Sequence, residues 1–155
     1  MLNESSIELY DYLYRTFYDV VTKNVYSMGA PQELTESDTT EGFIVLHVGD
    51  IYDESEFSRQ AYGEVRCYVE AFVPPISRGR LDFDKYSTYE DAINNTIHNA
   101  SKDNSGVYYI EEDSVIGSGA METSNANNVF FTFIKSFIVN INATAEQQIL
   151  SSEEE

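Results

Sequence analysis

Basic residues are scarce in this sequence. Its 155 residues include 27 Asp and Glu but only 9 Lys and Arg, so the formal net charge is -18 and the pI is near 4.2. Each contact with a nucleic-acid phosphate needs a Lys or Arg, and nine spread over the whole chain are too few, which excludes sequence-specific DNA binding. An acidic surface can still repel DNA so that it slides past, imitate DNA, or simply be solvated.

Cysteine and long apolar runs are scarce as well. The single Cys67 cannot form an internal disulfide, and its place in an alternating apolar run indicates a small buried thiol made in a reducing cytosol. No run approaches the ~18 apolar residues of a membrane span, so we expect no membrane segment. The first residues lack the basic head and apolar stretch of a signal peptide, so we expect no export by that route.

The chain nevertheless has enough apolar material for a core. Apolar residues make up 42% and aromatic residues 14% of the sequence, a composition that disordered, highly charged chains do not have. No internal repeat or second core is visible. We therefore predict a single domain over 1–145, followed by an acidic tail over 146–155.

Two segments have the periodicity of amphipathic helices. Apolar residues recur every three or four positions over 5–25, which predicts a long first helix. The segment 32–42 is polar and acidic without periodicity, which indicates a loop. A second helix is predicted from Ser87, where Ser87-Thr88-Tyr89-Glu90 fits a capping box, to Ala100.

Four segments have the character of strands. They are rich in β-branched and aromatic residues or alternate in polarity, and they cover 43–52, 61–73, 107–110 and 129–141. The stretch 114–128 between the last two is expected to be mostly loop. The order is therefore αββαββ, which predicts an α+β fold with two helices packed on one face of a mostly antiparallel sheet of about four strands.

The opposite face of this sheet should carry too many apolar side chains for a solvated surface. An apolar patch beyond a few hundred Å² usually marks an interface, so we expect a subunit interface there. Its predicted members are Tyr62, Tyr68, Phe72, Phe130, Ile134 and Ile138. The alternative is that the long loop at 111–128 folds back over this face.

No motif in the sequence indicates catalysis, and we expect no catalytic residue, metal site or cofactor. His47 and His98 lack a second ligand at metal-binding spacing, so we interpret both as structural or surface residues. The acidic cluster at 50–56 lacks the spacing of a calcium loop. Glu111 and Asp113 leave open a hydrolase with two carboxylates, although acids are so plentiful that such a pair carries little information.

The order of elements resembles that of phage tail-terminator, or tail-completion, proteins of the head-to-tail neck. The likeness lies in the helix from Ile7 to Val25, the acidic loop, two strands, the stretch Gly79-Arg80-Leu81-Asp82 before the helix Tyr86–Ala100, and a final hairpin closing with 133–142. It is a likeness of pattern and covers about residues 5–142. It implies a ring stacked where the tail tube meets the capsid, with DNA passing through an acidic lumen. The long 111–128 loop and the triple-Glu tail depart from the usual outline.

The first functional hypothesis is a non-enzymatic structural protein of a phage virion, located in the neck or tail and synthesised in the cytoplasm of a bacterial host. Its expected partners are further copies of itself in a ring, neighbouring neck, portal or tail-tube proteins, and DNA that passes without sequence-specific binding. The residues expected to line the channel are Glu33, Glu36, Asp38 and Glu41. The alternatives are an acidic DNA mimic that inhibits a DNA-binding enzyme, and a small carboxylate-based hydrolase.

Overall fold

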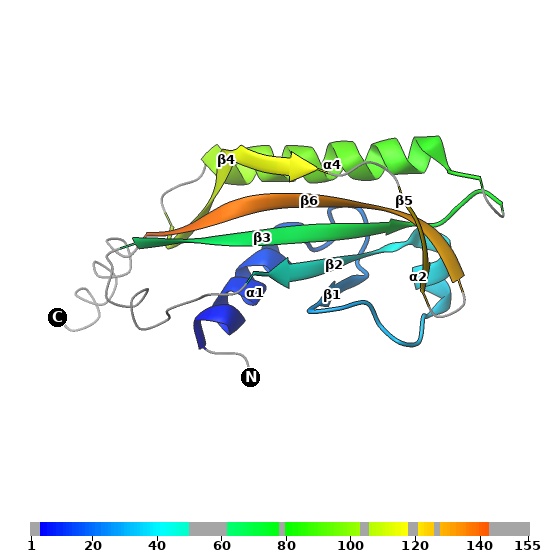
Figure 1. Cartoon of the computed structure of the whole chain (residues 1–155), viewed down its shortest axis with the longest axis horizontal. Helices are drawn as coiled ribbons and strands as arrows, with labels where there is room; N and C mark the ends of the chain where they lie inside the picture. The colour runs from blue at the N-terminus through cyan, green and yellow to red at the C-terminus, as the bar shows by residue number, and fades with distance from the viewer. Residues whose placement is uncertain are drawn as a thin grey trace.

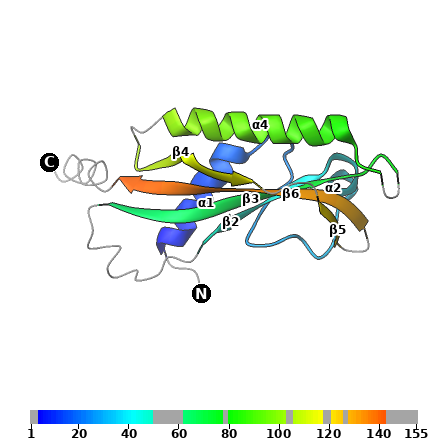
Figure 2. The same cartoon turned by 45° about the horizontal axis from the view of Figure 1, so that its top comes forward.

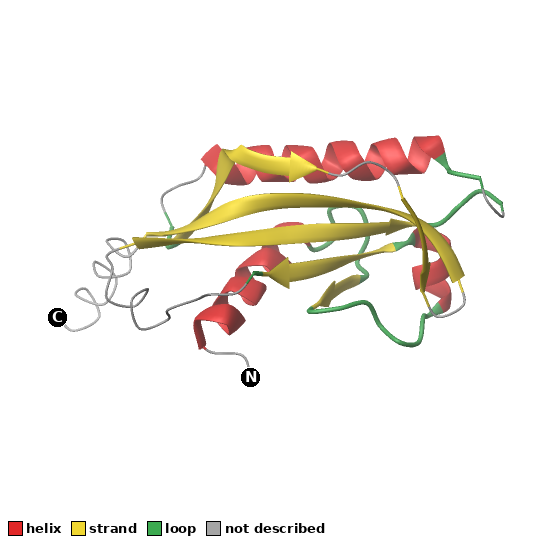
Figure 3. Ribbon diagram, viewed as in Figure 1, coloured by secondary structure: helices red, strands yellow, loops and turns green. Residues whose placement is uncertain are grey.

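The fold is a mixed β-sheet with helices packed against it (Figures 1 and 3). The computed structural model describes residues 4–49, 62–77, 80–102, 106–117, 121–125 and 128–142. Within these ranges the helices are α1 (Glu4–Phe17), α2 (Glu36–Glu41) and α4 (Phe83–Lys102). The strands are β1 (Val25–Ser27), β2 (Phe43–Val48), β3 (Tyr62–Val73), β4 (Tyr108–Gly117), β5 (Met121–Asn125) and β6 (Asn128–Asn142).

The strands lie in the order β1-β2-β3-β6-β4, and β5 also pairs with β6. β1 runs parallel to β2, while the other pairs are antiparallel. The prediction of a four-stranded, mostly antiparallel sheet in the order αββαββ is therefore wrong. The described part of the chain has three helices and a six-stranded mixed sheet. The additional elements are the short β1 and α2 and the strand β5.

The centre of the sheet is the long ladder between β3 and β6. It pairs the two strands from Tyr62 opposite Asn142 to Val73 opposite Phe131 without a break. On the other edge of β6, β4 and β5 follow one another, since β4 pairs with the second half of β6 and β5 with its first residues. The stretch expected to be a loop at 114–128 thus extends the sheet where it is described, and its described part lies alongside β6 rather than over the opposite face.

The main core lies between one face of the sheet and the helices α1 and α4. Figures 1 and 2 show both helices on the same side of the strands. Leu9, Leu13 and Phe17 of α1 are four residues apart and form the buried stripe of that helix. The apolar spacing over 5–25 also places Ile7 and Tyr14 on the stripe, but both are exposed, so that part of the prediction is wrong. The buried side chains from the sheet are those of alternate residues, among them Val65, Cys67, Val69, Ala71, Val73, Phe133, Phe137 and Val139.

A second, smaller core lies on the opposite face of the sheet. Phe43, Val45, Phe72 and Phe130 are buried there, and the rings of the three phenylalanines stack or meet edge to face. Three partly buried side chains from the segment that contains β1 and precedes α2 pack against this cluster: Tyr26, Ala30 and Leu34. This segment covers one end of the sheet face that the sequence analysis predicts to be a subunit interface.

Helix α1 ends eight residues before the end predicted from the apolar pattern. Asp19 has a φ of 58°, in the left-handed region that ends helices, and its backbone N–H donates to the carbonyl of Thr22 at 3.2 Å. The apolar residues that continue the three-four spacing beyond this turn belong to other structure, and Val25 opens β1.

Helix α4 begins four residues before the predicted capping box at Ser87. The carboxylate of Asp82 accepts the backbone N–H of Lys85 at 3.0 Å, so Asp82 caps the helix and Ser87 lies inside it. No helix in the described parts of the chain combines the length and apolar character that crossing a membrane requires.

Candidate functional site

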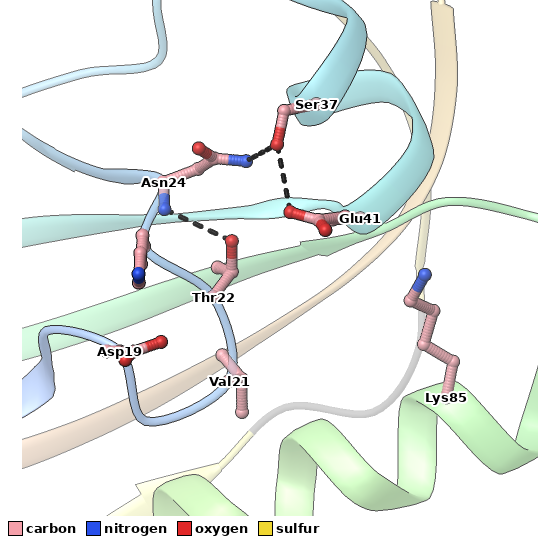
Figure 4. A pocket seen from close by; sticks show the side chains of 8 residues that line it. Asp19, Val21, Thr22, Asn24, Ser37, Glu41 and Lys85 are labelled. Atoms are coloured by element: carbon pink, nitrogen blue, oxygen red, sulfur yellow. Dashed lines mark hydrogen bonds between the residues drawn. The ribbon is translucent and has the colours of Figure 1, made fainter.

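An open, polar cleft lies where the segment 19–24, α2 and the first turn of α4 meet (Figure 4). Its volume is about 540 Å³, which is within the range of small-molecule sites. The residues that line it are Asp19, Val21, Thr22, Lys23, Asn24, Ser37, Glu41 and Lys85. Three separate elements of the chain thus contribute polar groups to one cavity.

A chain of hydrogen bonds holds one wall of the cleft in place (Figure 4). The amide of Asn24 donates to Ser37 Oγ at 3.0 Å and to the carbonyl of Gly42 at 3.1 Å. Ser37 Oγ in turn donates to a carboxylate oxygen of Glu41 at 2.9 Å. These bonds fasten α2 to the segment before β1, so the wall is a supported surface.

The two charged ends of the cleft come from different elements. Figure 4 shows Asp19 and Lys85 on opposite sides of it, and the ammonium of Lys85 donates to the carbonyl of Thr40 at 2.8 Å. The lining contains carboxylates, hydroxyls, an amide and ammonium groups. It can therefore hold a small polar group through hydrogen bonds. The described residues contain no cluster of three or more His, Cys, Asp or Glu that could hold a metal ion.

Asp38, on the far side of α2, is fully buried. Its carboxylate accepts the hydroxyl of Tyr26 at 2.8 Å and the backbone N–H of Thr35 at 2.9 Å, while its own N–H donates to Thr35 Oγ1 at 3.1 Å. This capping box starts α2. Burial, with a smaller contribution from Asp38, raises the pKa of Tyr26 to about 12.

The four acidic residues expected to line a channel have different environments. Glu33, Glu36 and Glu41 are exposed, and Glu41 lies in the cleft. Asp38 is not available to a channel, because it is buried and its carboxylate is engaged by Tyr26 and Thr35. The expectation that Asp38 faces a lumen is therefore wrong.

The predicted interface residues lie on the expected face of the sheet, but they are not equally accessible. Phe72 and Phe130 are buried in the second core of a single chain, so the expectation that they are exposed is wrong. Tyr68, Ile134 and Ile138 are half-buried. The side chain of Tyr62 lies outside the described part of the structure.

Other apolar side chains, which the sequence analysis does not single out, are more exposed than these. Ile7 and Tyr14 of α1 and Tyr18, just after its end, are 55%, 41% and 42% exposed, and the rings of the two tyrosines stack at 5.3 Å. Ile76 and Phe83, on either side of the turn between β3 and α4, are 66% and 71% exposed. The sequence analysis misses the exposure of Ile7 and Tyr14 because both fit the same three-four spacing as the buried Leu13 and Phe17.

The histidines occupy a strand and a helix, as the sequence indicates. His47 is half-buried on β2, where its ring stacks on Tyr68 at 4.4 Å and its Nε2 lies 3.7 Å from Glu70 Oε1. That distance is too long for a hydrogen bond, and no other group bonds to this nitrogen in the described structure. His98 is exposed on α4.

The remaining candidate groups are only partly placed. Glu111 is exposed on β4, whereas the side chain of Asp113 lies outside the described residues, so the pairing of these carboxylates stays a prediction. The acidic cluster at 50–56 and the tail at 146–155 also lie outside them.

Comparison with known proteins gives this chain no relative. No protein-family model matches the sequence, and no curated protein is significantly similar to it.

Proposed function

We propose that this chain is a non-enzymatic structural protein of a phage virion that forms an oligomeric ring at the head-tail neck or the tail terminus. The observation that carries the proposal is the distribution of exposed apolar side chains. Five of the seven exposed large apolar residues in the described structure fall in two groups: the α1 patch of Ile7, Tyr14 and Tyr18, and the turn patch of Ile76 and Phe83. The other two are Met28 and Met121.

Two different patches favour a ring over a symmetric dimer. A two-fold dimer buries the same patch of each subunit, whereas a head-to-tail contact joins two unlike patches and closes into a ring when the rotation permits. In Figure 1, α1 lies near the middle of the molecule and the turn between β3 and α4 at its right-hand end, so the two patches are separate and can meet different neighbours.

The net charge of the chain supports a channel through which DNA passes without binding to the protein. A net charge of -18 repels phosphates, and the exposed Glu33, Glu36 and Glu41 are the acids of the predicted lining that face solvent. Under this proposal the ring stacks on neck, portal or tail-tube proteins of the virion and is synthesised in the cytoplasm of a bacterial host.

Native mass spectrometry of the purified chain, with negative-stain images, tests the proposal. We expect one closed oligomer with a central hole at about 0.15 M salt, where the Debye length of ~8 Å limits repulsion between acidic subunits. A strict monomer at every concentration up to the millimolar range contradicts it. A monomer that inhibits a DNA-binding enzyme favours the DNA mimic instead.

A further inference from the structure

The start of α4 presents an apolar and basic surface. Ile76 and Phe83 are the two most exposed large apolar side chains in the described structure, and Arg80 between them in sequence is exposed. The backbone N–H of Ile76 donates to the carbonyl of Arg80 at 3.0 Å, and that of Arg80 to the carbonyl of Ser77 at 2.9 Å. We call Ile76, Arg80 and Phe83 the α4 start surface. Hydrogen bonds already hold its backbone, so binding costs little conformational entropy.

The other end of α4 borders a cleft of about 440 Å³, which we call the end cleft. Residues from α1, the last turn of α4 and the beginning of β4 line it: Tyr12, Arg15, Thr16, Ala100, Gly106, Val107 and Tyr108. The rings of Tyr12 and Tyr108 lie 5.4 Å apart and form an aromatic wall. The cavity is large enough to receive an aromatic side chain.

Carboxylates lie beside the end cleft. Glu8 Oε2 accepts the hydroxyl of Tyr108 at 3.0 Å, and Asp11 forms an ion pair with Arg15 at 3.1 Å. Both carboxylates are on exposed residues of α1. Among the residues that line the cleft, Arg15 alone is charged, and it is paired with Asp11. Glu8 therefore leaves the surroundings of the aromatic wall with an excess of one negative charge, two carboxylates against one guanidinium, which complements the apolar and basic α4 start surface.

The charge of the whole chain narrows the choice of partner surface. With 27 acidic and 9 basic residues, most contacts between two copies bring like charges together. A contact that places Arg80 near Glu8 and Asp11 pairs opposite charges. It also buries Phe83, and a buried aromatic side chain removes about 150–250 Å² from water.

We propose that the α4 start surface of one subunit docks into the end cleft of the next, with Phe83 against Tyr12 and Tyr108. The inference rests on the proposed ring and identifies its contact. The two surfaces lie at opposite ends of a 20-residue helix, about 30 Å apart, so they meet only between different copies.

Thiol crosslinking tests the contact directly. Asp84→Cys, next to Phe83, and Gly106→Cys place exposed thiols at the two surfaces and keep the Phe83 ring, and a Cβ at Gly106 meets only the carbonyl oxygen of Tyr108, at 4.0 Å. The native Cys67 is buried and burial raises its pKa to about 12, so it gives little background. A short bismaleimide should join an equal mixture of the two variants into covalent dimers, and should give the double variant a ladder of multimers. The matched control Asp91→Cys, on the exposed middle of α4, should give no product with Gly106→Cys.

The outcomes distinguish failure of this contact from failure of the ring proposal. Assembly by native mass spectrometry without crosslinking between positions 84 and 106 overturns this contact and leaves the ring proposal standing. Absence of assembly together with absence of crosslinks overturns both. Crosslinks formed mainly between two copies of the same variant indicate a symmetric dimer and overturn the head-to-tail contact.

Charge variants give a second, independent measurement. Phe83→Glu should weaken assembly at least tenfold, and the chain should stay folded because Phe83 is exposed. Met28→Glu, at another exposed apolar residue, should not weaken assembly. Arg80→Glu should also weaken it, and adding Asp11→Lys should restore most of the loss. Unchanged assembly of Phe83→Glu contradicts the proposal, as does absence of rescue in the double variant.

Discussion

At the scale of single residues, Gly42 shows how closely the second core is fitted to the backbone. It follows α2 with a φ of 90°, and a Cβ there would lie 2.5 Å from the carbonyl oxygen of Phe72 and 2.7 Å from the hydroxyl of Tyr89. Gly42→Ala therefore adds backbone strain to a collision with backbone atoms. We expect a loss of about 2–4 kcal/mol in the free energy of unfolding, measured by urea denaturation.

Gly29→Ala is the matched control for this substitution. Gly29 is exposed, and a Cβ there has nothing within 4 Å. We expect its free energy of unfolding to stay within about 0.5 kcal/mol of the parent value. Equal effects of the two substitutions would show that the conformation at Gly42 is not restrictive.

Cys67 links stability to alkaline pH. Burial raises the pKa of its thiol from 9.0 to about 12 in the folded chain. Below pH 9 the thiol is protonated in both states and its contribution is complete; between pH 9 and 12 only the unfolded state loses the proton, so stability falls as pH rises. We expect the difference in unfolding free energy between the parent and Cys67→Ala to shift by up to about 1.4 kcal/mol per pH unit in this window.

The measurement is urea denaturation of both proteins from pH 7 to 11. Comparing the two proteins cancels the tyrosines, which ionise in the same range in both. At pH 7 the substitution removes only packing, and its cost should be constant down to pH 6. Parallel curves for the two proteins up to pH 11 would mean that the thiol ionises freely in the folded state.

Sequence patterns predict the face on which a strand residue lies better than its burial. The alternation in β3 places Cys67 on the core side, and burial of that thiol is confirmed. The same alternation places Phe72 and Phe130 on the opposite face, correctly, but their burial depends on Leu34 and its neighbours packing over them. That contact joins segments that are apart in the sequence, and the two-residue alternation of a strand does not predict it.

At the scale of elements, α2 depends on one buried carboxylate. Asp38 caps the helix together with Thr35 and also accepts the hydroxyl of Tyr26. Asp38→Ala keeps the bond from the backbone N–H of residue 38 to Thr35 Oγ1, but it removes the bonds to the carboxylate and leaves the hydroxyl of Tyr26 and the backbone N–H of Thr35 without their acceptor. We expect a loss of about 2–3 kcal/mol in the free energy of unfolding, measured by urea denaturation.

Glu36→Ala, in the same first turn but exposed, should change stability by no more than about 0.5 kcal/mol. Tyr26→Phe combined with Asp38→Ala should cost less than the sum of the single changes, since the double variant has no orphaned hydroxyl. Strictly additive effects would show that the two groups act independently.

The long elements are predictable because their patterns are strong, while the short ones follow from local chemistry. β3 and β6 alternate over many residues, and their predicted positions are confirmed within about two residues. Thr35-Glu36-Ser37-Asp38 is a readable capping box for α2, yet the surrounding polar composition favours a loop. The cleft beside α2 joins segments that only the folded chain brings together, so its residues share no sequence motif.

At the scale of the whole molecule, charge governs the relation to nucleic acid. A net charge of -18 repels the phosphates of duplex DNA. We expect no binding of a labelled duplex in fluorescence anisotropy at about 50 mM salt, the condition that most favours phosphate contacts. A salt-dependent rise in anisotropy would show that the few basic residues form a DNA-binding patch.

The β3–β6 ladder also determines when the protein can fold. Its partners are roughly sixty to eighty residues apart in the chain, and the pairing ends at Asn142. During translation, β3 therefore leaves the ribosome long before β6 and keeps an unpaired edge beside its apolar residues. Closing so long a loop is slow, which places folding in the range of milliseconds to seconds. The repulsion between acidic chains therefore helps to keep the nascent chain apart from other copies until β6 is made.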